Sequence, residues 1–320
     1  MPECNRCSTP TPRRLGHLVR NNLACFVTRT RPNHSVLRDS FHQIESRGPQ
    51  EGPMEPCEIA RLPEELLSVA LSRTSPRDAC RAAVVSPAFR AAADSDTVWS
   101  CFLPPLDELP PLTDGEPCRK KDLFLRLSGR HVLLPGGLMS MWLDRETGAK
   151  CYMVSARALS IAWRDTPRYW NWVPLADSRF SETAVLRLVC WLDIPGKIDS
   201  KILSKGSVYA AHIVYKLADS SYGLDSPIQE ASIRVGGTNL TRKVCLQPNP
   251  QRSMSQNRRA EDVVLPRQRG DGWMELELGD FTCDGDEDGD VSFGVSETKA
   301  LNGKSGLVVQ GIEIRHKKSG

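Results

Sequence analysis

The 320 residues contain no long hydrophobic run. No segment approaches the roughly 18 consecutive apolar residues that a helix needs to cross a bilayer. The opening letters MPECNRCSTPTPRR also lack the apolar stretch of a secretory signal. We therefore expect a chain without membrane contact that stays inside the cell, in the cytoplasm and nucleus. The formal net charge of only +3 does not indicate a nucleic-acid partner, and we expect none.

Residues at catalytic or metal-ligand spacing are scarce as well. Eleven cysteines follow no pattern, and their odd number in a long chain indicates reduced thiols rather than a disulfide framework. Cys4 and Cys7 form a lone CxxC pair, and the six histidines are scattered. In CDGDEDGDVSFGVSE, Val295 stands where a calcium loop needs a bidentate acid. The sequence therefore predicts a non-catalytic protein with no metal site and no cofactor.

Local composition and apolar periodicity divide the chain into four segments. Residues 1–56 are rich in Arg, Pro, Ser and Asn without a sustained apolar period, which predicts a disordered N-terminal extension. An organelle-targeting peptide remains an alternative for this extension, and Met54 could be a working start. A helical unit is expected over 57–104, a hinge with a linking helix and strand over 105–149, and a β-rich domain over 150–318.

The helical unit is predicted from its capping residues. Pro63 suits a first helical position, and the two glutamates after it suit the positive end of a helix dipole. Ser75 and Ser86 are each followed by proline, as expected of an N-cap and a first helical residue. The result is three or four helices of under three turns. So small a unit buries little surface, so part of its apolar face should be covered by a partner or by the next domain.

Beyond the hinge, KKDLFLRLSGRHVLL predicts a helix and GGLMSMWLDRETGAK a strand that ends in a turn. Short alternating runs then follow, including RLVCWLDI, SVYAAHIVYKL and WMELEL. Their period of two is that of half-buried strands, and Gly, Pro and Asp turns separate them. The overall prediction is an α+β multidomain chain whose larger domain is an antiparallel β-sandwich of the jelly-roll kind.

The strings LPEELLSVAL and TSPRDACRAAVVSPAFRAAADSDTVW resemble an F-box, in the variant found in plant F-box proteins of the phloem-lectin type. In that family the helical unit docks on the Skp adaptor of an SCF ubiquitin ligase, and through it on cullin. The resemblance implies that the adaptor contact involves Leu62, Pro63, Leu66, Val85 and Trp99. For Leu66 and Trp99, packing within the small bundle is an equally good interpretation.

Further motifs, among them CYMVSARALSIAW, VCWLDIPGKI, DGWMELELGDF and KSGLVVQGIEIR, resemble the phloem-lectin or Nictaba-like domain over residues 150 to 316. The resemblance implies a β-sandwich that binds N-acetylglucosamine oligomers and N-glycan cores. It therefore implies a substrate receptor of a ubiquitin ligase that recognises glycosylated targets. The alternative is a stress-related carbohydrate-binding or protein-interaction module that does not act through ubiquitination.

The stretch IAWRDTPRYWNW carries the candidate sugar-stacking rings. Trp163 and Trp170 resemble the tryptophan pair implicated in sugar binding in the family, and flat rings stack on the C–H faces of sugars. Pro167 interrupts the segment, so a turn could bring both rings to one side. Core packing is an equal alternative for Trp163 and a weaker alternative for Trp170, while Trp172 and Trp191 are assigned to the core.

Two acids complete the site that the resemblance implies. Asp290 and Glu297 align with acids that assist sugar binding in the lectins. Asp290 is one methylene shorter than the glutamate usual at its position. Gly303 stands where an aromatic residue commonly precedes KSGL. Both differences lie at the expected glycan contact.

Overall fold

The computed structural model describes residues 62–105, 109, 119–248, 263–284 and 289–317. The expected N-terminal extension, most of the hinge and the middle of the acidic run lie outside the described residues. In the described part of the chain, no helix is long and apolar enough to cross a membrane.

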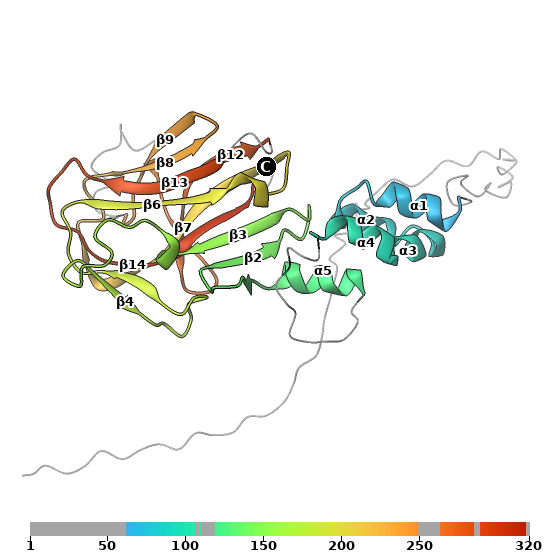
Figure 1. Cartoon of the computed structure of the whole chain (residues 1–320), viewed down its shortest axis with the longest axis horizontal. Helices are drawn as coiled ribbons and strands as arrows, with labels where there is room; N and C mark the ends of the chain where they lie inside the picture. Colours follow the sequence, from blue (N-terminus) through green and yellow to red (C-terminus); the bar gives the residue numbers. More distant parts are fainter. Residues whose placement is uncertain (1–61, 106–108, 110–118, 249–262, 285–288, 318–320) are drawn as a thin grey trace, which may run out of the picture. The chain divides into compact units, whose positions relative to one another are not determined.

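Five helices form the first part of the described chain (Figure 1): α1 (Glu64–Leu71), α2 (Pro76–Ala82), α3 (Pro87–Asp94), α4 (Asp96–Phe102) and α5 (Lys120–Gly129). Both predicted serine caps are confirmed: Ser75 Oγ accepts a hydrogen bond from Asp78 N at 3.1 Å, and Ser86 Oγ accepts one from Phe89 N at 3.3 Å. Pro63 is the N-cap of α1 rather than its first residue, because its ψ of 147° is extended.

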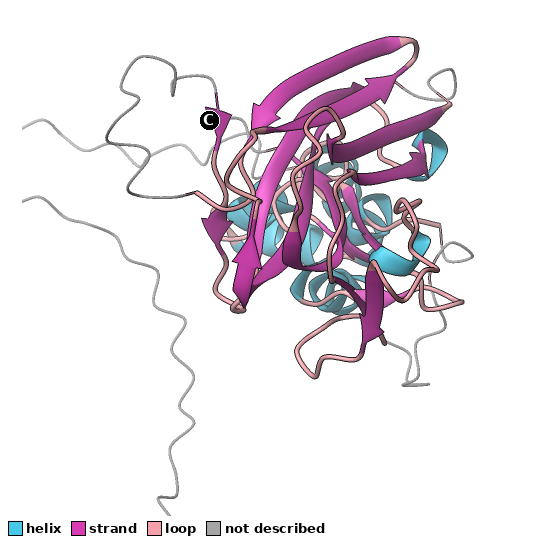
Figure 2. Cartoon of the chain, turned by 90° about the vertical axis from the view of Figure 1, so that its left-hand side faces the viewer, coloured by secondary structure: helices cyan, strands magenta, loops and turns pink. Residues whose placement is uncertain are grey.

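Strands dominate the remainder (Figure 2) and form two sheets. The nine-stranded sheet runs β1-β2-β3-β14-β7-β12-β11, with β5 also paired to β14 and β4 paired to β5. The five-stranded sheet runs β10-β9-β8-β13-β6. The strands are β1 (Val132–Leu133), β2 (Met139–Leu143), β3 (Lys150–Ser155), β4 (Trp170–Val173), β5 (Thr183–Leu186), β6 (Leu192–Asp199), β7 (Ser207–Tyr222), β8 (Gln229–Val235), β9 (Thr238–Val244), β10 (Val263–Val264), β11 (Arg267–Gln268), β12 (Met274–Cys283), β13 (Asp290–Glu297) and β14 (Ser305–His316).

The two sheets pack through alternating apolar side chains. Tyr209, Ala211, Ile213 and Tyr215 share one face of β7 and are fully buried, as expected of its core face. The other face of this segment is buried as well, at Ala210, His212 and Val214, so the expectation of a half-buried strand was wrong here. At Gly279 of β12, an added Cβ would lie 2.8 Å from Ile233 Cδ1 of β8, so the layers meet closely there. Pairing is antiparallel except between β9 and β10, which are parallel. The predicted antiparallel, β-rich domain is therefore confirmed.

The segment RLVCWLDI differs from its prediction, because β6 begins only at Leu192. Before it, Val189 forms an isolated bridge with Lys304 and is buried, while Leu188 and Cys190 on either side are exposed. Trp191 is 44% exposed, so its assignment to the core was wrong. Trp172 is half-buried and packs against the core, as predicted.

Candidate binding surfaces

Trp163 lies in a turn that precedes β4, and its side chain is 49% exposed. Its φ of 55° makes it the one non-glycine residue with positive φ in the described part of the chain. Such a conformation is rare for a bulky side chain and costs free energy, so it persists only where surrounding contacts fix it. The Trp163 ring lies 5.6 Å from the Tyr169 ring, centroid to centroid. The backbone therefore presents an aromatic face to solvent.

Neighbouring tryptophans hold this turn in place. The indole N–H of Trp170 donates a hydrogen bond to Ala162 O, and that of Trp172 donates one to Arg164 O, each at 3.1 Å. These carbonyls flank Trp163 on both sides. The N–H of Ala162 in turn donates to Asp193 O of β6 at 3.0 Å. The three contacts fix the turn against the edge of the five-stranded sheet.

The predicted platform of Trp163 and Trp170 is wrong, because Trp170 is only 2% exposed. Strand β4 pairs with β5 so that Trp170 lies opposite Leu186, whose side chain is also buried. With that register the Trp170 ring lies in the core, and its indole N–H donates to Ala162 O in the turn. Trp170 thus supports Trp163 from behind and cannot stack on a sugar beside it.

The two predicted acids do not form one site. They are seven residues apart on β13, an odd separation that places them on opposite faces of the strand, at roughly 23 Å along it. Asp290 is exposed and pairs with Lys197 Nζ at 2.7 Å. Glu297 is buried and pairs at 2.5 Å with Lys304 Nζ, which is itself fully buried. A single sugar cannot contact both carboxylates.

Glu297 instead holds a loop. Its Oε1 accepts hydrogen bonds from the backbone N–H groups of Lys299 and Ala300, at 3.1 and 2.9 Å. Lys304 Nζ donates to Cys190 O at 3.0 Å. Burial alone would raise the pKa of Glu297, but its hydrogen bonds from Lys304 and the loop hold that pKa below its usual value. Both charges are therefore committed to the structure between β13 and β14.

Asp193 is an acid that the sequence reasoning missed. It lies on β6, and its backbone carbonyl accepts the hydrogen bond from Ala162 N–H. Its side chain is half-buried on the outer face of the sheet. Among the described residues no ion pair or side-chain hydrogen bond involves its carboxylate, and burial raises its pKa. Such a carboxylate, on the residue that is bonded to the Trp163 turn through its backbone, is suited to accept hydrogen bonds from sugar hydroxyls. Only the backbone contact between Ala162 and Asp193, 31 residues apart in sequence, shows that the turn and this acid are neighbours.

The helical unit presents an apolar stripe. Leu66 and Val69, three residues apart, are on one face of α1, with Leu66 54% exposed, and the exposed Leu62 lies just before the N-cap of that helix. Pro63 is exposed beside them, and Val85, in the turn after α2, is 68% exposed. Four of the five predicted adaptor residues, Leu62, Pro63, Leu66 and Val85, are thus available to a partner.

Trp99 is the exception, and its assignment to the adaptor contact was wrong. Its side chain is 1% exposed and packs against Phe102 and Phe124, with ring centroids at 5.6 and 5.2 Å. Its indole N–H donates to Ala93 O at 2.6 Å. Trp99 therefore forms the core that holds α3, α4 and α5 together.

The capped short helices and the two-layered sheets together define an F-box protein with a C-terminal β-sandwich. Residues 59–103 match the F-box-like family and residues 149–316 match Phloem protein 2. The chain is 42% identical over 258 residues to F-box protein PP2-B10 of Arabidopsis thaliana, covering 79% of this chain and 92% of that relative. It is 37% identical over 301 residues to F-box protein PP2-B1 of the same plant, covering 81% and 90%. The chain belongs to the F-box proteins of the phloem protein 2 B family.

Likeness to solved structures is weak. A Podospora anserina GH26-CBM35 β-(1,4)-mannanase matches 53% of this chain and 28% of its own, with a TM-score of 0.31 and 8% identity. This similarity carries no argument about function.

Proposed function

We propose that this protein is the non-catalytic substrate-recognition subunit of an SCF-type E3 ubiquitin ligase, acting in the cytoplasm and nucleus. The helical unit docks on the Skp adaptor, and the β-sandwich binds N-acetylglucosamine-containing glycans on target proteins. The observation that carries the adaptor contact is the exposed stripe of α1, since apolar side chains on one face of a small helical unit are typical of a covered surface.

The glycan contact is supported by the Trp163 turn. It combines an exposed ring, a strained backbone held by one buried and one half-buried tryptophan, and the Asp193 carboxylate, which has no partner among the described residues. Aromatic stacking with a few polar groups that replace water is the composition that a saccharide site requires. Asp290 and Glu297 are not needed for this site.

The adaptor contact is tested by pull-down of a purified Skp-type adaptor with the full chain. Leu66→Asp should weaken binding by at least tenfold, because it puts a charge at the centre of an apolar contact. Leu125→Asp is the matched control, since Leu125 is 39% exposed on α5 and lies outside the stripe. Equal retention of adaptor by the wild type and by a folded Leu66→Asp chain would overturn the docking assignment.

A second candidate is a protein-interaction module that recognises no sugar. It is favoured by the exposed side chains of Leu188, Tyr222 and Leu301, because Leu188 and Tyr222 both pack against Gly303 at the loop end of the sandwich. Absence of binding to any glycan, together with retained binding of the adaptor, would favour this candidate.

A further inference from the structure

We propose that the outer face of the five-stranded sheet carries a second subsite, next to Trp163, for an anionic group on a saccharide, with Arg234 as its main ligand. The inference rests on the proposed glycan function and extends it to sugars that bear a carboxylate or a sulfate. Both groups offer several negatively charged oxygens to one guanidinium.

The first support is strand register. Lys197 lies opposite Ser292, Ser292 opposite Arg234, and Arg234 opposite Asn239, so these four residues form one row across β6, β13, β8 and β9. On β6, β13 and β8 the residues of the opposite face that adjoin this row, such as Ile198, Phe293 and Ile233, are buried in the core. At about 4.8 Å per strand the row is roughly 14 Å long. It is therefore a continuous polar strip on the sheet.

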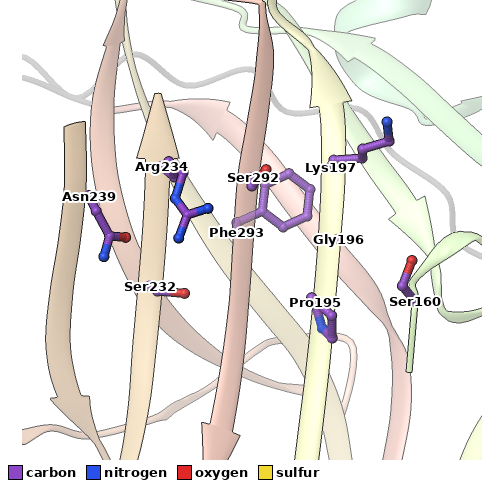
Figure 3. Close-up of a pocket in the computed structure, with 9 residues that line it drawn as sticks. All are labelled: Ser160, Pro195, Gly196, Lys197, Ser232, Arg234, Asn239, Ser292 and Phe293. Atoms are coloured by element: carbon purple, nitrogen blue, oxygen red, sulfur yellow. The ribbon is translucent and has the colours of Figure 1, made fainter. Parts of the chain in front are cut away.

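The second support is shape. A hollow of about 380 Å³ opens on this face (Figure 3), with Pro195, Ser232 and Arg234 among its lining residues. Gly294 lies between Pro195 and Ser232 in the next row of the sheet. A Cβ at Gly294 would come within 2.9 Å of Ile194 O, so the glycine leaves the middle of that row without a side chain.

The third support is charge. Arg234 is exposed, and no ion pair or hydrogen bond joins its side chain to another residue of the described chain. Lys197, by contrast, is paired with Asp290, and no acid is among the residues that line the hollow. Figure 3 shows the Arg234 guanidinium turned toward β13 and the Asn239 amide turned toward β8. A planar guanidinium with neighbouring amide and hydroxyl donors is suited to bidentate binding of an oxyanion.

The fourth support is continuity with the Trp163 turn. Ser160 lines this hollow and also a shallower one formed by the turn residues from Ser160 to Thr166. Its backbone N–H donates to Pro195 O at 2.8 Å, which fixes the turn beside the strip. A saccharide with one ring on Trp163 can therefore extend over the strip, where its next residues face Arg234.

The experiment compares three tetrasaccharides by calorimetry with the full chain: the neutral N-acetylglucosamine tetramer, its sulfated form and tetragalacturonate. The wild type should bind at least one anionic probe at least tenfold more tightly than the neutral one, and added salt should reduce that difference. Arg234→Gln should remove the preference and leave neutral binding within twofold. Arg234→Lys keeps the positive charge but loses the planar guanidinium, so it should retain only part of the preference for the anionic probe. Arg145→Gln is the matched control, because Arg145 is exposed in the turn between β2 and β3 of the other sheet.

The outcomes separate the two proposals. Tighter binding of sulfate alone or of carboxylate alone identifies the group, and either supports the subsite if Arg234→Gln abolishes it. Neutral binding with no anionic preference, or a preference that survives in a folded Arg234→Gln chain, overturns the subsite and leaves the glycan function standing. Binding of the anionic probes alone, lost in Arg234→Gln, supports the subsite and overturns the N-acetylglucosamine preference. No binding of any probe overturns both.

Discussion

Replacing Trp163 by glycine should separate binding from stability. The ring is about half-buried, so its loss removes roughly 100 Å² of burial, or about 2.5 kcal/mol at 25 cal/mol per Å². Glycine relieves the left-handed strain, which costs a bulky residue roughly 1–2 kcal/mol. The net loss of unfolding free energy should therefore be about 1 kcal/mol. Sugar affinity should fall at least roughly tenfold, since the stacking face is lost.

Trp170→Ala is the contrasting variant. Removing a fully buried tryptophan should cost about 3–5 kcal/mol, and it also removes the hydrogen bond to Ala162 O. For a domain of this size, 1 kcal/mol lowers Tm by roughly 2–4 °C. The assay is thermal unfolding of both variants alongside titration with an N-acetylglucosamine oligomer. A larger Tm loss for Trp163→Gly than for Trp170→Ala, or unchanged affinity in Trp163→Gly, would refute the reasoning.

Two further predictions concern buried charges. Lys304→Met leaves Glu297 buried without its partner, so the unfolding free energy measured by denaturant titration should fall by about 3–5 kcal/mol. The double variant Lys304→Met with Glu297→Gln should recover part of this loss, because it also removes the buried charge. Equal losses in the single and the double variant would contradict a specific pair. Acid should also destabilise the chain. Burial lowers the pKa of His212 to about 4, so the unfolded state binds more protons below pH 6.5, and stability falls from there toward pH 4. Burial would raise the pKa of Glu275, but hydrogen bonds from Arg315 and Arg267 lower it to about 2, so its contribution is full above pH 4.5 and is lost toward pH 2. Tm measured from pH 7 to pH 2 should fall below pH 6.5 because of His212 and fall further below pH 4.5 because of Glu275. A flat profile between pH 6.5 and pH 4.5 would exclude the His212 effect, and no further loss between pH 4.5 and pH 2 would exclude the Glu275 effect.

Features with local signals could be predicted from the sequence. Ser75 and Ser86 act as caps because the hydroxyl, the following proline and the helix start lie within four residues of each other. Strand β7 follows from alternation in one uninterrupted run, although its central residues are buried on both faces. Both patterns need only the geometry of one element.

The candidate site depends on contacts that the sequence does not display. Pro167 allows a turn, but whether Trp170 then faces the core or the solvent depends on the register between β4 and β5. Asp193 becomes a neighbour of Trp163 only through the bond from Ala162. Asp290 and Glu297 looked like one pair by resemblance, whereas the period of two along β13 places them on opposite faces.

The crowding of tryptophans near residue 170 now has a physical explanation. An exposed ring in a left-handed conformation needs both flanking carbonyls fixed, and indole N–H groups from a buried and a half-buried tryptophan supply that support at Ala162 and Arg164. Substitutions at Trp170 should therefore weaken sugar binding although the ring touches no sugar, because they release the turn. The two roles differ in one measurable respect. Substitution of a supporting residue should lower sugar affinity in proportion to the unfolding free energy that it removes. Loss of the Trp163 ring should lower sugar affinity while the unfolding free energy stays nearly constant.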